Sequence, residues 1–539
     1  MMGQYRWAVL AAIFLSIPAS WAGPCQSSVQ GPGFDIFNCS KAELDSMPSL
    51  PKEAQVLDFS GNHFKSLPLI EESPACTACA ETNPSVHCRL DISFRRNHIK
   101  TLEPRALREL KCLHTLDLSY NDIKADLFHH FVQGVYYLEI LNLRGNPLGQ
   151  LPDSVIADPF MPSLSHLDLS SCKLTQMGRN SVDDFSKLMT LNLSSNQLTD
   201  IHADTFKGLR SLIHLDLSEN KLVYFSEHIF GDQTNLQDLR LNGNEIEGFH
   251  DNAFYDDSNL INLDLRDNKL QEVPYTAINK LGSLKTLSLS GNPIHKVTQH
   301  TTPNNVQNLV LDDMPLLEEI GPDDLTAFTN LVSLSISGGK GFTKIHNGAL
   351  KKHFPNLRHV HLDDNWIGTL ESDALPWEQL ETLTLSGNPW MCDDRLRWML
   401  EADCIKEPVV CAMPGTLKGR DLRTLDAKDL KREVTILPMA SIVVSLLAIP
   451  VVCACAVFVW RRRRFCPCQS HELQGRYVSV FTRDGDEDSE VRIDVRLKES
   501  ARRIVAVSNG SADDTHHLVK FGDEKGSKAD AYDTEEEEI

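Results

Sequence analysis

Hydrophobic and polar positions recur along most of this chain in one short pattern. In residues 116–121, 215–220 and 263–268, two leucines flank one polar residue, and an asparagine follows three positions after the second leucine. Alternation with a period of two is typical of a strand that is buried on one face. The pattern therefore predicts a short strand in each copy, with the leucine pair turned inward and the residue between them on the open face.

The asparagine, or a residue in its place, marks each copy and is called the anchor below. Most anchors are 24 residues apart, and there are fourteen: Asn62, Asn97, Asn121, Asn146, Cys172, Asn196, Asn220, Asn244, Asn268, Asn292, Met314, Gly339, Asn365 and Asn388. One copy cannot bury its own apolar face, so neighbouring copies must stack to share a core. The buried anchor amide is expected to hydrogen-bond backbone groups of the turn that leaves the strand.

A second apolar position recurs ten residues after many anchors. It holds Leu107, Phe131, Ile156, Val182, Phe206, Phe230, Phe254, Ile278 and Leu375. This position predicts an internal layer of side chains behind the strands.

These copies resemble the leucine-rich repeat, whose pattern is LxxLxLxxN with a period of 20 to 29 residues. The resemblance covers about residues 40–422. It implies an α/β solenoid, a curved horseshoe with a parallel concave sheet and cysteine-containing caps. On this basis residues 23–50 form the N-terminal cap, residues 51–387 the repeats and residues 388–425 the C-terminal cap.

The two flanks of the repeats have the composition of targeting and membrane segments. Residues 1–22 contain Arg6, an apolar run and small residues at Ser20 and Ala22, which predict a cleavable secretory signal. After a linker at 426–433, residues 434–460 carry no charge and predict one transmembrane helix of roughly 40 Å. Four arginines, 461–464, follow at once and predict a cytoplasmic tail over 461–539. The expected location is the plasma membrane, with the N-terminus outside.

The resemblance also implies how the cap cysteines pair. Cys25 and Cys39 fall in the segment that resembles the N-terminal cap, and Cys392 and Cys411 fall in the C-terminal cap. Asp394 replaces the family's second C-terminal cap cysteine, so Cys404 is left without an evident partner.

An insertion between the first two anchors carries more cysteines. Cys76, Cys79, His87 and Cys88 lie there, and a zinc site is conceivable from these ligand types. Because secreted cysteines usually oxidise, disulfides are the favoured interpretation. Cys88 and Cys112 each lie nine residues before an anchor, so neighbouring strands would hold them about 5 Å apart and a bridge is predicted. Cys76 and Cys79 are predicted to close a small loop, and Cys172, at an anchor, to be a buried free thiol.

The residues between the leucine pairs form the candidate binding surface. The charged positions of this column include Asp117, Asp168, Asp216, Arg240 and Asp264. They are interpreted either as a docking strip for a basic protein or as ordinary solvation of a face that must be polar. His166 and His214 share one phase, two repeats apart, and are predicted to be surface histidines.

Glycosylation and an irregular stretch bear on the same surface. Asn38 and Asn192 lie in Asn-x-Ser sequons, and a glycan on Asn192 would cover part of the concave centre. The repeat pattern degrades over residues 292–365. A change of curvature, a specialised surface and drift under weak constraint are all compatible with that.

Composition and motifs argue against two classes of function, nucleic-acid binding and catalysis. The net charge is −21, which argues against nucleic acid as a partner. We find no catalytic motif, no metal site and no cofactor motif in the sequence, so an enzyme is not expected. In the tail, Tyr477 and Val480 fit a sorting motif, and Cys466 and Cys468 are acylation candidates that basic charge near anionic lipid would assist.

The chain is similar to single-pass leucine-rich-repeat adhesion molecules and receptors such as insect tartan, capricious and connectin. This similarity implies adhesion through an extracellular or cell-surface protein ligand, with homophilic or dimeric association possible. The alternative is a receptor or co-receptor for a soluble protein, a growth factor or a microbial product, that signals through cytoplasmic adaptors. A third interpretation is a mainly structural, matrix-linking protein.

Overall fold

The computed structural model describes residues 25–29, 35–51, 54–67, 70, 89–102, 106–107, 110, 112–127, 135–153, 161–183, 185–255, 258–297 and 304–431. The predicted signal peptide, Cys76, Cys79, Cys88, the hydrophobic stretch at 434–460 and the tail motifs lie outside these residues. Within the described ranges, no helix has the length and apolar character needed to cross a membrane.

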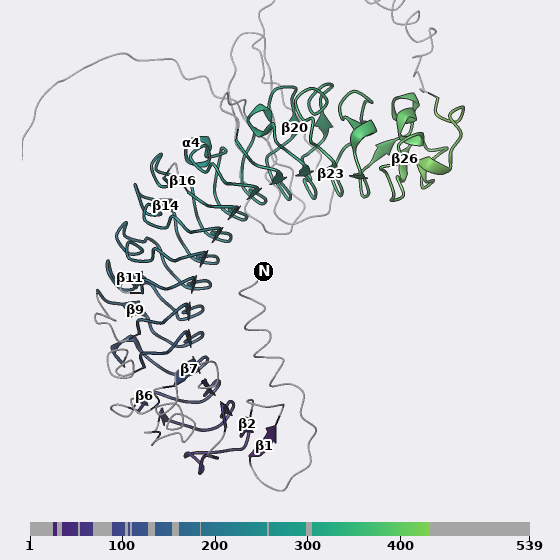
Figure 1. The fold of residues 1–539 in the computed structure, drawn as a ribbon. Coiled ribbons are helices and arrows are strands. Elements are labelled where there is room, and N and C mark those ends of the chain that lie inside the picture. The colour runs from purple at the N-terminus through teal and green to yellow at the C-terminus, as the bar shows by residue number, and fades with distance from the viewer. Residues whose placement is uncertain are drawn as a thin grey trace, which may run out of the picture. The chain divides into compact units, whose positions relative to one another are not determined.

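One sheet of sixteen strands runs through the described part of the chain (Figure 1). Its first two strands, β1 (Gln26–Val29) and β2 (Asp35–Asn38), form an antiparallel hairpin. The remaining fourteen are parallel, one for each anchor: β3 (Val56–Asp58), β5 (Leu90–Ser93), β7 (Leu113–Asp117), β8 (Ile140–Asn142), β10 (His166–Asp168), β12 (Thr190–Asn192), β13 (His214–Asp216), β15 (Asp238–Arg240), β17 (Asn262–Asp264), β18 (Thr286–Ser288), β19 (Asn308–Val310), β21 (Ser333–Ser335), β23 (His359–His361) and β24 (Thr382–Thr384). The predicted parallel sheet is confirmed, and it lines the inner side of a curved solenoid.

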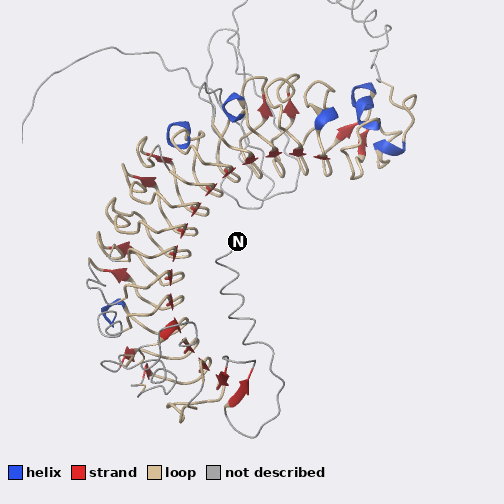
Figure 2. Ribbon diagram, viewed as in Figure 1, coloured by secondary structure: helices blue, strands red, loops and turns tan. Residues whose placement is uncertain are grey.

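The outer side of the solenoid corrects one expectation. The resemblance implied an α/β architecture, but the only α-helix among the described residues is α4 (Tyr275–Ile278). The other return segments form turns, short 3-10 helices and two-stranded parallel pairs such as β14 (Tyr224–Phe225) with β16 (Gly248–Phe249) (Figure 2). With about 24 residues per copy shared between a strand, two turns and the return, each return segment is short, and the fold is a β-solenoid.

The core follows the two apolar periods read from the sequence. The leucine pairs are buried, and so are the described residues at the second position: Leu107, Val182, Phe206, Phe230, Phe254, Ile278 and Leu375. Phe131 and Ile156 lie outside the described residues. Phenylalanines stack between neighbouring copies, with ring centroids of Phe230 and Phe254 5.1 Å apart and those of Phe225 and Phe249 5.4 Å apart. Each copy therefore completes the core of the next.

The anchor side chains bind the copies to one another, as expected. The Asn244 Nδ2 donates to the carbonyls of Leu217 and Leu241, both at 3.0 Å, and its Oδ1 accepts from the Leu222 N–H at 3.0 Å. At the irregular anchor Cys172, the thiol donates to the Leu143 carbonyl at 3.2 Å. The amide of each asparagine thus satisfies backbone groups in its own turn and in the preceding copy.

The residue directly before the anchor adopts a left-handed conformation in every copy. Eight of these residues are not glycine, namely Arg96, Tyr120, Ser171, Ser195, Glu219, Asp267, Asp313 and Asp364, and their φ values lie between 51° and 57°. The other six are Gly61, Gly145, Gly243, Gly291, Gly338 and Gly387. Glycine adopts this conformation without steric cost, whereas a side chain there is strained.

Disulfides close both ends of the described solenoid. Cys25 bonds to Cys39, and Cys392 bonds to Cys411, as the cap resemblance implied. Cys112 is also disulfide-bonded, and its partner lies outside the described residues. Cys172 and Cys404 are buried free thiols, and burial raises the pKa of Cys172 to about 12. This thiol is therefore a packing group and not a nucleophile.

Candidate functional site on the concave sheet

The predicted column exists, and its members face one another in register. Asp216 pairs with Asn192 on one side and with Arg240 on the other, and Arg240 pairs with Asp264. Asp117 and Asp168 flank Asn142 in the same row. Because the parallel strands repeat without a register shift here, sequence period alone placed these residues correctly.

The carboxylates of the column form hydrogen bonds within the chain, and their role in docking a partner stays a prediction. The Oδ1 atoms of Asp58, Asp117, Asp168 and Asp216 each accept the backbone N–H two residues later, at 2.8 to 3.0 Å. Each side chain therefore closes the turn after its own strand. Burial is the main cause that raises the pKa of Asp58, Asp117 and Asp168 above the usual range.

Both sequon asparagines sit in this same turn. Asn38 Oδ1 accepts from the Ser40 N–H at 2.8 Å, and Asn192 Oδ1 accepts from the Ser194 N–H at 2.9 Å. The spacing of an Asn-x-Ser sequon is therefore also the spacing of the structural turn. Glycosylation of Asn38 and Asn192 stays a prediction.

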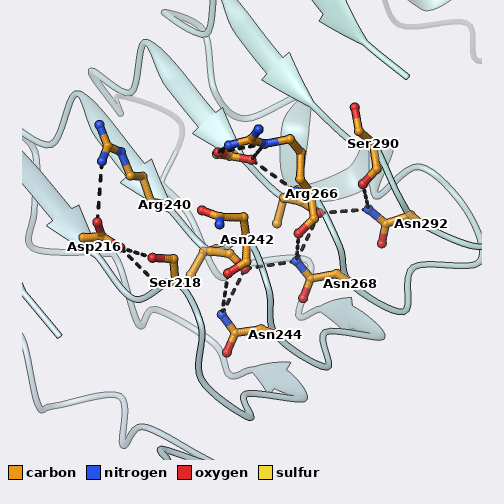
Figure 3. Close-up of polar contacts among 12 residues, drawn as sticks. Asp216, Ser218, Arg240, Asn242, Asn244, Arg266, Asn268, Ser290 and Asn292 are labelled. Carbon is orange, nitrogen blue, oxygen red and sulfur yellow. Dashed lines mark hydrogen bonds and ion pairs between the residues drawn. The ribbon is translucent and has the colours of Figure 1, made fainter. Parts of the chain in front are cut away.

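A depression of about 550 Å³ lies on the concave face over β15 to β19. It is lined by residues that include Arg240, Asp264, Arg266, Ser288 and Asp312. Arg266 contacts Asp264 through two nitrogens, the closest at 2.7 Å, and Arg240 lies 3.6 Å from Asp216 (Figure 3). The charges that sequence reasoning selected here are thus largely paired within the chain.

A second set of four carboxylates is unpaired, and two of them, Asp267 and Asp313, line the depression. Glu219, Asp267, Asp313 and Asp364 directly precede their anchors and are exposed, and no ion pair joins them to any described residue. In each case the next copy has glycine at the same position, and a Cβ there would collide with the carboxylate. We call these four residues the acidic ridge.

Sequence reasoning missed the acidic ridge, although a signal was present. Acidic residues and glycine alternate at the position before the anchor from Glu219 to Gly387. That alternation places one negative charge in every second copy, and the glycine leaves room for it.

The histidines also differ from the prediction in part. His166 is buried, with Nδ1 2.8 Å from the Ser165 hydroxyl, so it is not a surface histidine. His214 is half-exposed, and its Nδ1 lies 2.6 Å from Asp238. Hydrogen bonds from His214 and then from Asn262 lower the pKa of Asp238. Among the described residues no group of three possible metal ligands converges.

The irregular copies keep their turns by another route. Asp312 Oδ1 accepts from the Ser337 N–H at 2.8 Å, and Asp363 Oδ1 accepts from the Ser386 N–H at 2.9 Å. These bonds reach across 25 and 23 residues to the next copy. A carboxylate from the preceding copy replaces the missing one in the turn, so the degraded pattern still has a closed backbone.

Comparison with known proteins agrees with this geometry. A family model described as leucine rich repeat matches residues 136–198, 186–246 and 234–294, and a second model of the same description matches residues 109–126. The matched residues are thus leucine-rich repeats.

Several leucine-rich-repeat relatives match over part of their length. Mouse chondroadherin is 43% identical over 74 residues, which are 13% of this chain and 20% of that protein. Chicken tsukushi is 29% identical over 210 residues, 37% of this chain and 53% of that protein. Human leucine-rich repeats and immunoglobulin-like domains protein 1 is 28% identical over 201 residues, 35% and 18% of the two chains. The match thus spans about half or less of each relative.

Two solved structures also show similarity to this chain. A Leptospira interrogans leucine-rich-repeat protein is 25% identical, with a TM-score of 0.48 over 68% of this chain and 94% of that one. The Drosophila Toll–Spatzle complex contains a chain that is 19% identical, with a TM-score of 0.46 over 72% and 57% of the two chains.

Asp168 provides a test of the turn assignment. Asp168→Asn is expected to keep the bond to the Ser170 N–H, since Asn142 and Asn192 make that bond on both sides, and to remove a buried charge. The variant should be up to about 1 kcal/mol more stable at neutral pH, whereas Asp168→Ala should be about 1 kcal/mol less stable. Urea unfolding of each variant would measure this.

The pH dependence has a definite sign. Because the folded state raises the pKa of Asp168 above 3.8, it holds the proton more tightly than the unfolded state does. The stability advantage of Asp168→Asn is therefore present at pH values above the raised pKa of Asp168. It disappears as the pH falls through that pKa toward 3.8. Ser170→Ala belongs in all the chains compared, because Asp168→Asn creates a sequon with Ser170. A pH-independent difference would contradict the assignment.

Proposed function

We propose that this protein is a cell-surface molecule whose repeats bind another protein on the concave sheet, for adhesion or cell–cell recognition. The observation that carries the proposal is the polar depression over β15 to β19, whose lining includes Asp267 and Asp313 of the acidic ridge. A rigid parallel sheet presents these side chains in fixed positions, so little conformational entropy is lost when a partner binds. The unpaired carboxylates of the acidic ridge, two of which line the depression, fit a partner with a basic surface.

The location belongs to the same proposal. A signal at 1–22, a spanning helix at 434–460 and a tail at 461–539 would display the repeats outside the cell. The disulfides at both ends of the solenoid support an oxidising compartment. In the tail, Tyr477 with Val480 would direct sorting, and Cys466 and Cys468 would carry acyl chains beside the arginines.

A cell-mixing assay tests the function. Non-adherent cells that express the full chain are expected to aggregate with one another or with partner-bearing cells, and aggregation should weaken when salt is raised, since exposed charges are screened. A Glu219→Gln, Asp267→Asn, Asp313→Asn triple variant should aggregate less at equal surface expression. Failure to aggregate in every mixture, together with saturable capture of one secreted protein by the same cells, would replace adhesion by the soluble-ligand receptor alternative.

A further inference from the structure

Three arginines surround one aromatic ring near the N-terminal end of the solenoid. The guanidinium carbons of Arg95, Arg96 and Arg144 lie 4.8, 5.6 and 6.0 Å from the centroid of the Tyr120 ring. Arg144 Nε also donates to the Tyr120 hydroxyl at 2.8 Å. The four residues come from three successive copies. Arg95 and Arg96 precede the anchor Asn97, Tyr120 precedes Asn121, and Arg144 lies two positions before Asn146. We call these four residues the arginine cluster.

The positive charges of the arginine cluster lack ion-pair partners. Within the described ranges, none of the three guanidinium groups lies within 4.0 Å of a carboxylate, whereas Arg89, Arg240 and Arg266 do. The carboxylates of Asp117 and Asp168, in neighbouring copies, accept hydrogen bonds from the backbone of their own turns. Like charges gathered in this way repel one another, and the Tyr120 ring offsets part of that repulsion through its negative face.

The backbone is adapted to hold the ring. Tyr120 has a φ of 56°, a left-handed conformation that is rare for a bulky residue. In the next copy Gly145 has a φ of 74°, and a Cβ there would lie only 2.7 Å from the Tyr120 ring. No other copy places an aromatic residue at this position. The strained backbone and the glycine together fix the ring on which the guanidinium groups lie.

We propose that the arginine cluster binds an acidic segment of a protein partner, with two or three adjacent aspartate or glutamate side chains on the guanidinium groups. Guanidinium groups bind carboxylates through paired hydrogen bonds, and side chains already held on a ring lose less freedom when they do so. All three charges lie within 6.0 Å of one point, which suits a segment of a few residues. A long polyanion would instead meet a chain of net charge −21.

The binding of an acidic segment at the arginine cluster rests on the proposed function in one respect, because both require a protein partner. It concerns a different surface, on β5, β7 and β8, from the depression on β15 to β19. The two surfaces carry opposite charge, so one partner could contact both only if it were itself dipolar.

A peptide titration tests the proposal. The probe is a fluorescein-labelled decapeptide of alternating glutamate and aspartate, titrated by anisotropy against the full chain in an uncharged detergent. The Arg95→Ala, Arg96→Ala, Arg144→Ala triple variant should bind at least about tenfold more weakly than the parent. The matched control is Lys65→Ala, Lys100→Ala, Lys124→Ala, which removes the same charge from exposed positions after the anchors Asn62, Asn97 and Asn121 and should bind as the parent does.

Further variants keep the test decisive if the alanine triple variant folds poorly. Arginine-to-lysine substitution at the same three positions preserves charge but loses the planar fork, and should weaken binding severalfold. Equal loss in both alanine triples would mean non-specific attraction and would overturn the proposal. Binding of a heparin octasaccharide in place of the peptide would also overturn it. Because the cell-mixing assay depends on the acidic ridge and this titration on the arginine cluster, the two proposals fail separately.

Discussion

Asn244→Ala is expected to lower the free energy of unfolding by about 3–5 kcal/mol. The buried amide bonds two carbonyls and one N–H that belong to two copies, and alanine would leave these backbone groups unsatisfied. No water can replace the amide easily, because Asn244 is 7% exposed. Urea unfolding of the full chain, followed by far-ultraviolet circular dichroism, would measure the loss.

Asn242→Ala is the matched control. Asn242 lies two positions earlier in the same turn and is only partly buried, and only its backbone carbonyl, not its side chain, accepts from Asn244. Its removal should change stability by less than about 0.5 kcal/mol. Equal effects of the two substitutions would show that the anchor amides do not hold the copies together.

Removal of the C-terminal cap disulfide is the second large effect. Cys392→Ala with Cys411→Ala opens a bridge between residues 19 positions apart, and should cost about 3 kcal/mol. The cap covers the last strand: Trp390 is 1% exposed, and its indole N–H donates to the Leu385 carbonyl at 2.9 Å. Loosening should therefore begin at β24, where hydrogen exchange of the Leu383 and Leu385 amides would accelerate before that of β13.

Cys404→Ala is the control for the disulfide. Cys404 is buried in the same cap but is a free thiol, so its removal takes away a side chain of similar size without a covalent link. It should cost about 1 kcal/mol or less. A loss as large as that of the disulfide variant, or protection at β24 that does not change in the disulfide variant, would contradict the assigned role.

The repeat period of the sequence predicted those structural features that depend only on the neighbouring copy. Strand positions, the register of Asp216 beside Arg240 and the bonds of Asn244 all follow from a repeat near 24 residues. The α/β expectation failed because the return segments lack the length for helices. The burial of His166 was missed because its surroundings come from side chains of adjacent strands, which a period does not specify.

The candidate site was predicted only in part for a similar reason. The column was found, yet Asp168 and its equivalents serve their own turns, a role that depends on side-chain rotamers. The acidic ridge requires a glycine in the next copy, and the arginine cluster requires Tyr120 and Gly145 together. Both features depend on different residues at the same position in neighbouring copies. The repeat pattern describes only the residues that the copies have in common.

The central claim is that a protein partner binds the concave sheet, and a bulky group placed there tests it most directly. Ser288→Asn in β18 creates an Asn-Leu-Ser sequon inside the depression, and Asp232→Asn creates an Asn-Gln-Thr sequon on the exposed return segment of a nearby copy. A mass shift would verify that each glycan is attached, and Ser288→Asn with Ser290→Ala would provide the same substitution without a glycan.

Cell aggregation in the mixing assay is the measurement. We expect the glycan of Ser288→Asn to abolish it, while Asp232→Asn and the unglycosylated double variant aggregate like the parent at equal surface expression. If the Ser288→Asn chain does not reach the cell surface, Asp216→Asn in β13 supplies a second glycan position on the concave face. This substitution makes a sequon with Ser218. Full aggregation of the Ser288→Asn chain with its glycan verified, or loss of aggregation only in Asp232→Asn, would contradict binding in the depression of the concave sheet.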